Sequence, residues 1–74
     1  MSEADKIFTR IGYIKKLEEI ENGNLIRVSY NKENKYSIIF KISTKEIFLD
    51  GFRAIEIEEL QAINEKVKEL GWNE

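Results

Sequence analysis

The stretch YSIIFKI, residues 36–42, is the clearest β-strand in the chain and guides the interpretation of everything around it. Successive side chains of a strand point to opposite faces, so the stretch divides into two sets. One face carries Tyr36, Ile38, Phe40 and Ile42, and the other carries Ser37, Ile39 and Lys41. The first face is wholly apolar and needs cover from another layer, whereas the second face is mixed.

Three further strands are predicted around this one, over residues 13–21, 25–30 and 46–50. The dipeptide Asn22-Gly23 favours a tight hairpin turn between the first two of them. Residues Ile14, Leu17 and Ile20 are three apart, which would also suit one face of a helix. A strand is preferred there because a hairpin turn needs a strand on both sides.

Apolar residues recur with helical spacing near both ends of the chain, over residues 2–11 and 57–70. The first stripe consists of Ala4, Ile7, Phe8 and Ile11, and the second of Ile57, Leu60, Ile63, Val67 and Leu70. Ser2 is a favourable N-cap, and Gly12 and Gly71 follow the stripes where a left-handed residue commonly ends a helix. Glu56 is a weaker N-cap for the second helix.

This order predicts a single α+β domain over residues 1–74: a helix, an antiparallel β-meander of three or four strands, and a second helix. Each helix has one apolar stripe and the clearest strands have one mainly apolar face, so the simplest arrangement has two layers. Both helices would lie on the same face of the sheet. The other sheet face would then be open to solvent.

The composition narrows the possible functions. The 74 residues include no cysteine and no histidine, which removes thiolate and imidazole chemistry and Cys/His metal sites. We therefore expect no enzyme activity, no metal and no cofactor, and a cytoplasmic location, since small secreted domains usually need disulfides. No apolar run is long enough to span a membrane. The net charge of −2 disfavours binding to nucleic acid, which normally requires a basic excess.

Two segments, ADKIFTRIGY (residues 4–13) and EELQAINEKVKELGW (residues 58–72), resemble a group of small uncharacterised proteins encoded by phages and prophages of Firmicutes. The matching positions are Ala4, Asp5, Ile7, Phe8, Ile11, Gly12, Tyr13, residues 58–64, Lys66 and residues 69–72. The resemblance implies a phage accessory protein acting inside a bacterial host cell, with inhibition of a host defence or a host enzyme as the concrete expectation. It implies no catalytic activity.

Apolar residues on the outward side of the predicted strands mark the candidate site. Leu25, Ile39 and Phe48 come from three different strands, and several exposed apolar neighbours can form a patch of the size found at binding sites. The turn after the last strand adds Phe52 and Arg53. The candidate partner-binding residues are Leu25, Arg27, Ile39, Lys41, Phe48, Asp50, Phe52 and Arg53. Two alternatives stay open, namely a shifted register in the strands, or cover of the patch by the turn bearing Phe52.

Other residue groups have simpler structural explanations. The acids Glu56, Glu58 and Glu59 suit the positive end of a helix dipole better than a catalytic or metal site. Tyr30, Tyr36 and Phe40 share a face with aliphatic residues, which favours a core over a base-stacking platform. We therefore expect stoichiometric binding to a host or phage protein. The alternatives are self-association, as a homodimer rather than a monomer, and binding of a nucleotide or single-stranded nucleic acid.

Overall fold

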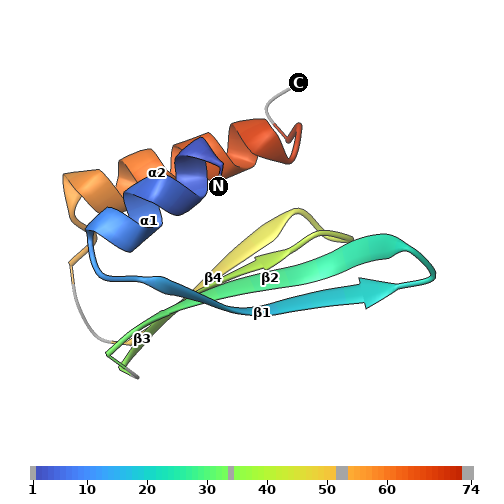
Figure 1. The fold of residues 1–74 in the computed structure, drawn as a ribbon, viewed down its shortest axis with the longest axis horizontal. Coiled ribbons are helices and arrows are strands. Elements are labelled where there is room, and N and C mark those ends of the chain that lie inside the picture. Colours follow the sequence, from blue (N-terminus) through green and yellow to red (C-terminus); the bar gives the residue numbers. More distant parts are fainter. Residues whose placement is uncertain (1, 34, 52–53, 73–74) are drawn as a thin grey trace.

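A four-stranded antiparallel sheet carries two helices over one of its faces in the computed structural model of the chain (Figure 1). The structure describes residues 2–33, 35–51 and 54–72. The elements are α1 (Glu3–Arg10), β1 (Ile14–Glu21), β2 (Asn24–Lys32), β3 (Tyr36–Lys41), β4 (Glu46–Asp50) and α2 (Ile57–Glu69). The strands lie in the order β1-β2-β3-β4, so each strand pairs only with its neighbours in sequence. The predicted α+β meander with a helix at each end is confirmed.

Side chains near the helix starts satisfy backbone N–H groups that have no partner within the helix. In α1 the Ser2 hydroxyl accepts a hydrogen bond of 3.1 Å from the Asp5 N–H, as a serine N-cap does. In α2 the bond runs in the other direction, because the Glu59 carboxylate reaches back and accepts from the Glu56 N–H at 3.1 Å. Glu59, the third residue of α2, thus makes its half of a capping box with Glu56.

Both helices end with the same backbone motif. Gly12 follows α1 with a φ of 99°, and Gly71 follows α2 with a φ of 74°, a region that glycine enters without steric cost. The next N–H then turns back into the helix. The Tyr13 N–H donates to the Phe8 carbonyl at 2.8 Å, and the Trp72 N–H donates to a carbonyl in the last turn of α2 at 3.0 Å. These are the bonds of a Schellman ending, and the left-handed glycine predicted after each helix is confirmed.

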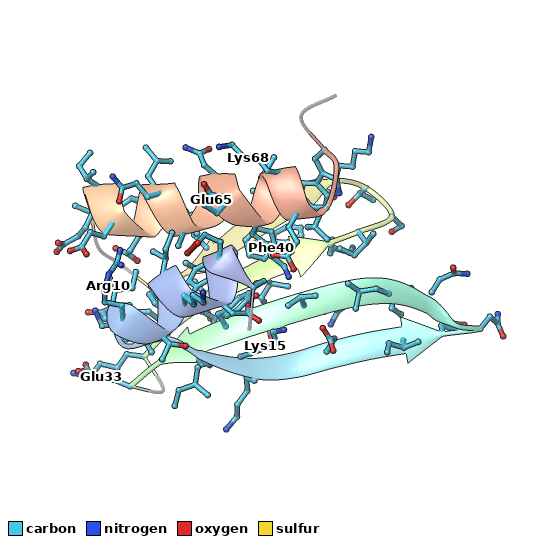
Figure 2. The ribbon with its side chains drawn as sticks, turned by 45° about the horizontal axis from the view of Figure 1, so that its top comes forward. Arg10, Lys15, Glu33, Phe40, Glu65 and Lys68 are labelled. Atoms are coloured by element: carbon cyan, nitrogen blue, oxygen red, sulfur yellow. The ribbon has the colours of Figure 1, made fainter. Side chains whose placement is uncertain are left out.

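Aromatic rings from α1 and the sheet form the centre of the core between the two layers. The Phe8 ring stacks on the Tyr30 ring, with centroids 4.1 Å apart, and meets the Phe40 ring edge-on at 6.3 Å. Phe40 lies between the helices and the sheet and has no exposed surface (Figure 2). The buried cluster is Phe8, Tyr13, Val28, Tyr30, Ile38, Phe40, Ala62 and Ile63. The predicted place of Tyr30, Tyr36 and Phe40 on the core side of the strands is confirmed, with Tyr36 only partly buried.

The buried face of α2 differs from the predicted stripe. Ile57 and Leu60 were expected to face the core, but their exposed fractions are 70% and 46%. The buried residues of the helix are Glu59, Ala62, Ile63 and Lys66. Hydrogen bonds to Glu59 and the position of Lys66 above the Tyr30 ring turn this polar side of the helix inward. The prediction was therefore wrong for the first turn of α2.

A change of register in β2 moves Leu25 away from its predicted position. The pairing of β1 with β2 steps from Glu19↔Arg27 to Ile20↔Leu25, which leaves Ile26 as one extra residue in β2. One extra residue reverses the alternation of side chains, so the residues before Ile26 point to the opposite side from the one that the alternation of residues 27–30 predicts. Leu25 is partly buried and packs against the core cluster. Its expected place on the outward side of the sheet was wrong.

Candidate functional site

On β2, β3 and β4, the face of the sheet opposite the helices is built from three rows of cross-strand neighbours. The pairing of β2 with β3 and of β3 with β4 fixes which residues are adjacent in each row. The rows are Arg27–Lys41–Glu46, Ser29–Ile39–Phe48 and Asn31–Ser37–Asp50. We call these nine residues the open face. In the described part of the chain, both helices lie on the other side of the sheet (Figure 1).

The middle row gives the open face an apolar centre. Ile39 pairs directly with Phe48, and cross-strand pairs of this kind bring the two side chains into contact. Phe48 is 43% exposed and Ile39 is half-buried, whereas Ile38 and Phe40 on either side of Ile39 in β3 are completely buried. Phe48 therefore points away from the core because of its place in the alternation of β4, and this exposes an aromatic ring.

Polar contacts surround this apolar centre. The Arg27 guanidinium lies 3.7 Å from the Glu19 carboxylate on the neighbouring strand β1. The Lys41 ammonium lies 5.7 Å from the centroid of the Phe48 ring, close enough for a cation–π attraction. On the other side of the centre, the Asn31 amide donates to the Ser37 hydroxyl at 3.0 Å. An apolar middle with a polar rim is the usual composition of a protein-binding surface.

The structure brings together five of the eight predicted partner-binding residues. Arg27, Ile39, Lys41, Phe48 and Asp50 all belong to the open face. Leu25 does not, because the extra residue in β2 directs it to the core. The predictions for Phe52 and Arg53 fall outside the residues that the structure describes.

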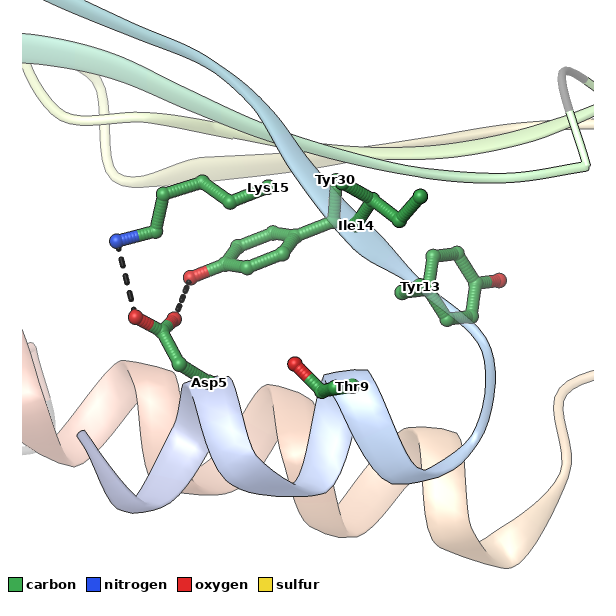
Figure 3. A pocket seen from close by; sticks show the side chains of 6 residues that line it. All are labelled: Asp5, Thr9, Tyr13, Ile14, Lys15 and Tyr30. Carbon is green, nitrogen blue, oxygen red and sulfur yellow. Dashed lines mark hydrogen bonds and ion pairs between the residues drawn. The ribbon is translucent and has the colours of Figure 1, made fainter. Parts of the chain in front are cut away.

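A second polar site joins α1 to the sheet and was not anticipated from the sequence. The Tyr30 hydroxyl donates to the Asp5 Oδ1 atom at 2.6 Å, and the Lys15 ammonium lies 3.0 Å from Asp5 Oδ2 (Figure 3). These groups and Thr9 line a pocket of about 350 Å³ between α1 and β1. The signal that could have found it is the placement of Tyr30 on the core face of a strand, because a buried tyrosine hydroxyl needs a partner.

The electrostatics of this second site hold each group in its ordinary charge state at neutral pH. Burial alone would raise the pKa of the Asp5 carboxyl, but the hydrogen bond from Tyr30 and the contact with Lys15 outweigh it and lower that pKa. The hydrogen bond to Asp5 raises the pKa of the Lys15 ammonium. Burial, followed by the bond to Asp5, raises the pKa of the Tyr30 hydroxyl far above its usual value. All three pKa values thus lie further from neutral pH than usual. The arrangement therefore suits a fixed link between α1 and the sheet better than proton transfer.

A third buried polar contact connects the end of α1 to the start of α2. The Tyr13 hydroxyl donates to the Glu59 carboxylate at 2.6 Å, and Glu59 is only 6% exposed. The same carboxylate accepts from the Glu56 N–H, so Glu59 acts as a structural acceptor. Within the described residues, no three acidic side chains are grouped closely enough to hold a metal ion.

Comparisons with protein-family models, curated proteins and solved structures found no match for this chain. Neither helix in the described part of the chain has the length and apolar character needed to cross a membrane.

Proposed function

We propose that the protein acts without catalysis, by stoichiometric binding of its open face to the surface of another protein. The observation that carries the proposal is the Ile39–Phe48 pair, an apolar centre on the one sheet face that the helices leave uncovered. Aromatic residues at the centre of a binding surface commonly supply much of its binding energy. The polar rows on either side would form the rim of the interface.

The proposed partner is a protein of a bacterial host or of a phage, with inhibition of a host defence or a host enzyme as the specific role. This part of the proposal comes from the resemblance of residues 4–13 and 58–72 to phage-encoded proteins. The open face itself favours a protein partner over nucleic acid, because its four charged side chains include equal numbers of each sign: Arg27, Lys41, Glu46 and Asp50. A surface that binds phosphates needs a basic excess.

The experiment is capture from a bacterial host lysate with tagged wild-type protein and with the variants Ile39→Asp and Phe48→Asp. Both variants place a charge at the apolar centre, where its burial against a partner would be costly. We expect them to keep the circular dichroism spectrum of the wild type and to lose the captured protein. The matched control is Leu60→Asp, which adds the same charge at an exposed apolar residue of α2.

Retention of the same captured protein by Ile39→Asp and Phe48→Asp would contradict the proposal. Light scattering on the purified protein tests the alternative of self-association. If the open face binds a second copy, the wild type is a dimer and the same two variants are monomers.

A further inference from the structure

The two edges of the sheet differ in how well they are protected against pairing with another strand. An edge strand presents unpaired backbone N–H and C=O groups, and proteins protect such edges with bulges and charges. β1 has both kinds of protection, with irregular pairing between Lys15 and Leu17 and charged residues at five of its eight positions. β4 pairs regularly with β3 along its length and has the sequence EIFLD, with three consecutive apolar residues.

The helices do not extend over the β4 edge. Ile38 in β3 has no exposed surface, yet Leu49, its direct partner in β4, is 45% exposed although it lies on the same, helix-facing side. Phe48 is 43% exposed on the opposite side. A strand placed beside β4 would therefore cover apolar surface on both faces of the sheet and also satisfy the backbone groups of the edge.

The charges at the ends of β4 indicate what kind of strand fits. Glu46 and Asp50 are exposed, point to the same side as Phe48, and form no ion pair with any described residue. Opposite charges on directly paired residues stabilise a strand pair, and like charges destabilise it. The complementary strand carries basic residues at both ends and apolar residues between them.

A second copy of β4 does not meet this requirement. The antiparallel self-pairing that matches Ile47 with Leu49 also places Glu46 opposite Asp50 of the other copy. That arrangement brings two carboxylates together at each end of the pair, which is unfavourable.

We propose that the outer edge of β4 binds an extended segment of a partner protein by strand addition, and that this segment has the pattern basic–apolar–apolar–apolar–basic. Main-chain hydrogen bonds would supply affinity for any extended segment. The charges at the ends of β4 would select segments with basic residues at both ends. The proposal concerns the backbone edge of β4 and the flanking charges Glu46 and Asp50, and it does not depend on the Ile39–Phe48 centre of the open face binding a protein.

The test uses a synthetic peptide with blocked ends, Thr-Lys-Val-Ile-Val-Lys-Thr, and a twin in which both lysines are replaced by glutamates. Amide hydrogen exchange and NMR titration of the full chain report on residues 46–50. We expect the basic peptide to slow exchange in β4 and to bind at least tenfold more tightly than its acidic twin. A version of the basic peptide with alternate backbone N-methyl groups is expected to lose binding, because it cannot complete the strand pairing.

Two double variants of the protein separate local from overall charge. Glu46→Lys with Asp50→Lys is expected to reverse the preference and bind the acidic peptide. Glu21→Lys with Glu33→Lys makes the same change in net charge at two exposed sites outside β4, the end of β1 and the turn after β2, and is expected to keep the preference for the basic peptide. The variant Ile39→Asp, which would disable the open face, is expected to bind the basic peptide as the wild type does.

Three results would overturn the inference. They are unchanged exchange in β4 with either peptide, equal binding of the two peptides, and protection of β4 that depends on protein concentration alone. The last result would show that a second copy occupies the edge, and light scattering on the same samples would detect the dimer.

Discussion

At the scale of single residues, two hydrogen bonds between a tyrosine and a carboxylate hold the helices in place. Tyr30 donates to Asp5 from the sheet to α1, and Tyr13 donates to Glu59 from the end of α1 to α2. Each is a short bond of 2.6 Å between a tyrosine and an acid, and hydrogen bonds to charged groups are stronger than those between neutral groups. The apolar core attracts the layers to each other, and these bonds fix their relative positions.

The variant Tyr30→Phe should lose about 1.5–3 kcal/mol of stability, the usual contribution of a hydrogen bond to a charged group. It should also change how stability depends on pH. The pKa of Asp5 is lowered in the folded state, so its contribution is complete above about pH 3.9 and is lost as the pH falls through the folded value. The pKa of Tyr30 is raised, so its contribution is complete below about pH 10 and is lost as the pH rises further.

Urea unfolding over a pH series tests this prediction. Removal of the hydroxyl should make the acid loss of stability smaller, because the pKa of Asp5 moves back towards its ordinary value, and should remove the alkaline loss that belongs to Tyr30. Tyr13→Phe is the control, since it removes the bond to Glu59 and leaves Asp5 unchanged. An identical pH profile for Tyr30→Phe and the wild type would show that the Asp5 contact is absent in solution.

At the scale of elements, the first turn of α2 shows how buried polar contacts can override an apolar pattern. Burial of Ile57 and Leu60 would turn Glu59 towards solvent and break its bonds to Tyr13 and Glu56. A buried donor left without a partner costs about 1–3 kcal/mol, which is comparable to the gain from burying one aliphatic side chain. Further along the helix, Ile63, Val67 and Leu70 do pack on the core, as their spacing predicts.

Replacing Glu59 by alanine should therefore destabilise the protein by at least about 2 kcal/mol, because the Tyr13 hydroxyl and the Glu56 N–H both lose their acceptor. The neighbouring acid Glu58 provides a matched control in the same turn. It is exposed, and its contact of 3.8 Å with Arg10 joins two exposed side chains. Glu58→Ala should change the stability by less than about 0.5 kcal/mol in the same urea titration. Equal effects of the two variants would contradict the inward orientation of Glu59.

These elements also show what the sequence could and could not predict. The strand over residues 36–42, the Asn22-Gly23 turn and the glycine endings of both helices depend on local patterns, and the structure agrees with each. The extra residue at Ile26 and the rotation of α2 depend on partners far away in the chain, so no local pattern contains them. Five of the predicted binding residues lie together because strand alternation is itself local, and Leu25 was misplaced because it lies beyond the extra residue.

At the scale of the whole molecule, the sheet separates a covered face from an open one. Phe40 and Phe48 make the contrast clear, because they lie on adjacent strands but on opposite sides of the sheet. Phe40 contacts rings from α1, from β2 and from Trp72 after α2, whereas Phe48 is nearly half exposed. Stability and partner binding are thus expected to depend on different sets of residues.

The same substitution at these two positions should give very different results. Phe40→Ala should cost about 3–5 kcal/mol, since it leaves a cavity in the core. That is a large part of the total stability expected for a chain of this length, roughly 4–11 kcal/mol. Phe48→Ala should cost about 1 kcal/mol or less and should weaken partner capture. Thermal unfolding followed by circular dichroism measures both, and similar losses at the two positions would contradict the assignment of the two faces.

The order of the strands also bears on the rates of folding and unfolding. Every strand pairs with its neighbour in sequence, so the sheet can grow by successive local hairpins with little loss of chain entropy. The contact between α1 and α2 is different, because it joins residues 3–10 to residues 57–69 and closes nearly the whole chain into a loop. We expect the helix pair to dock after the transition state. Changes between the helices should then mainly shorten the lifetime of the native state, whereas changes within the hairpins should slow its formation.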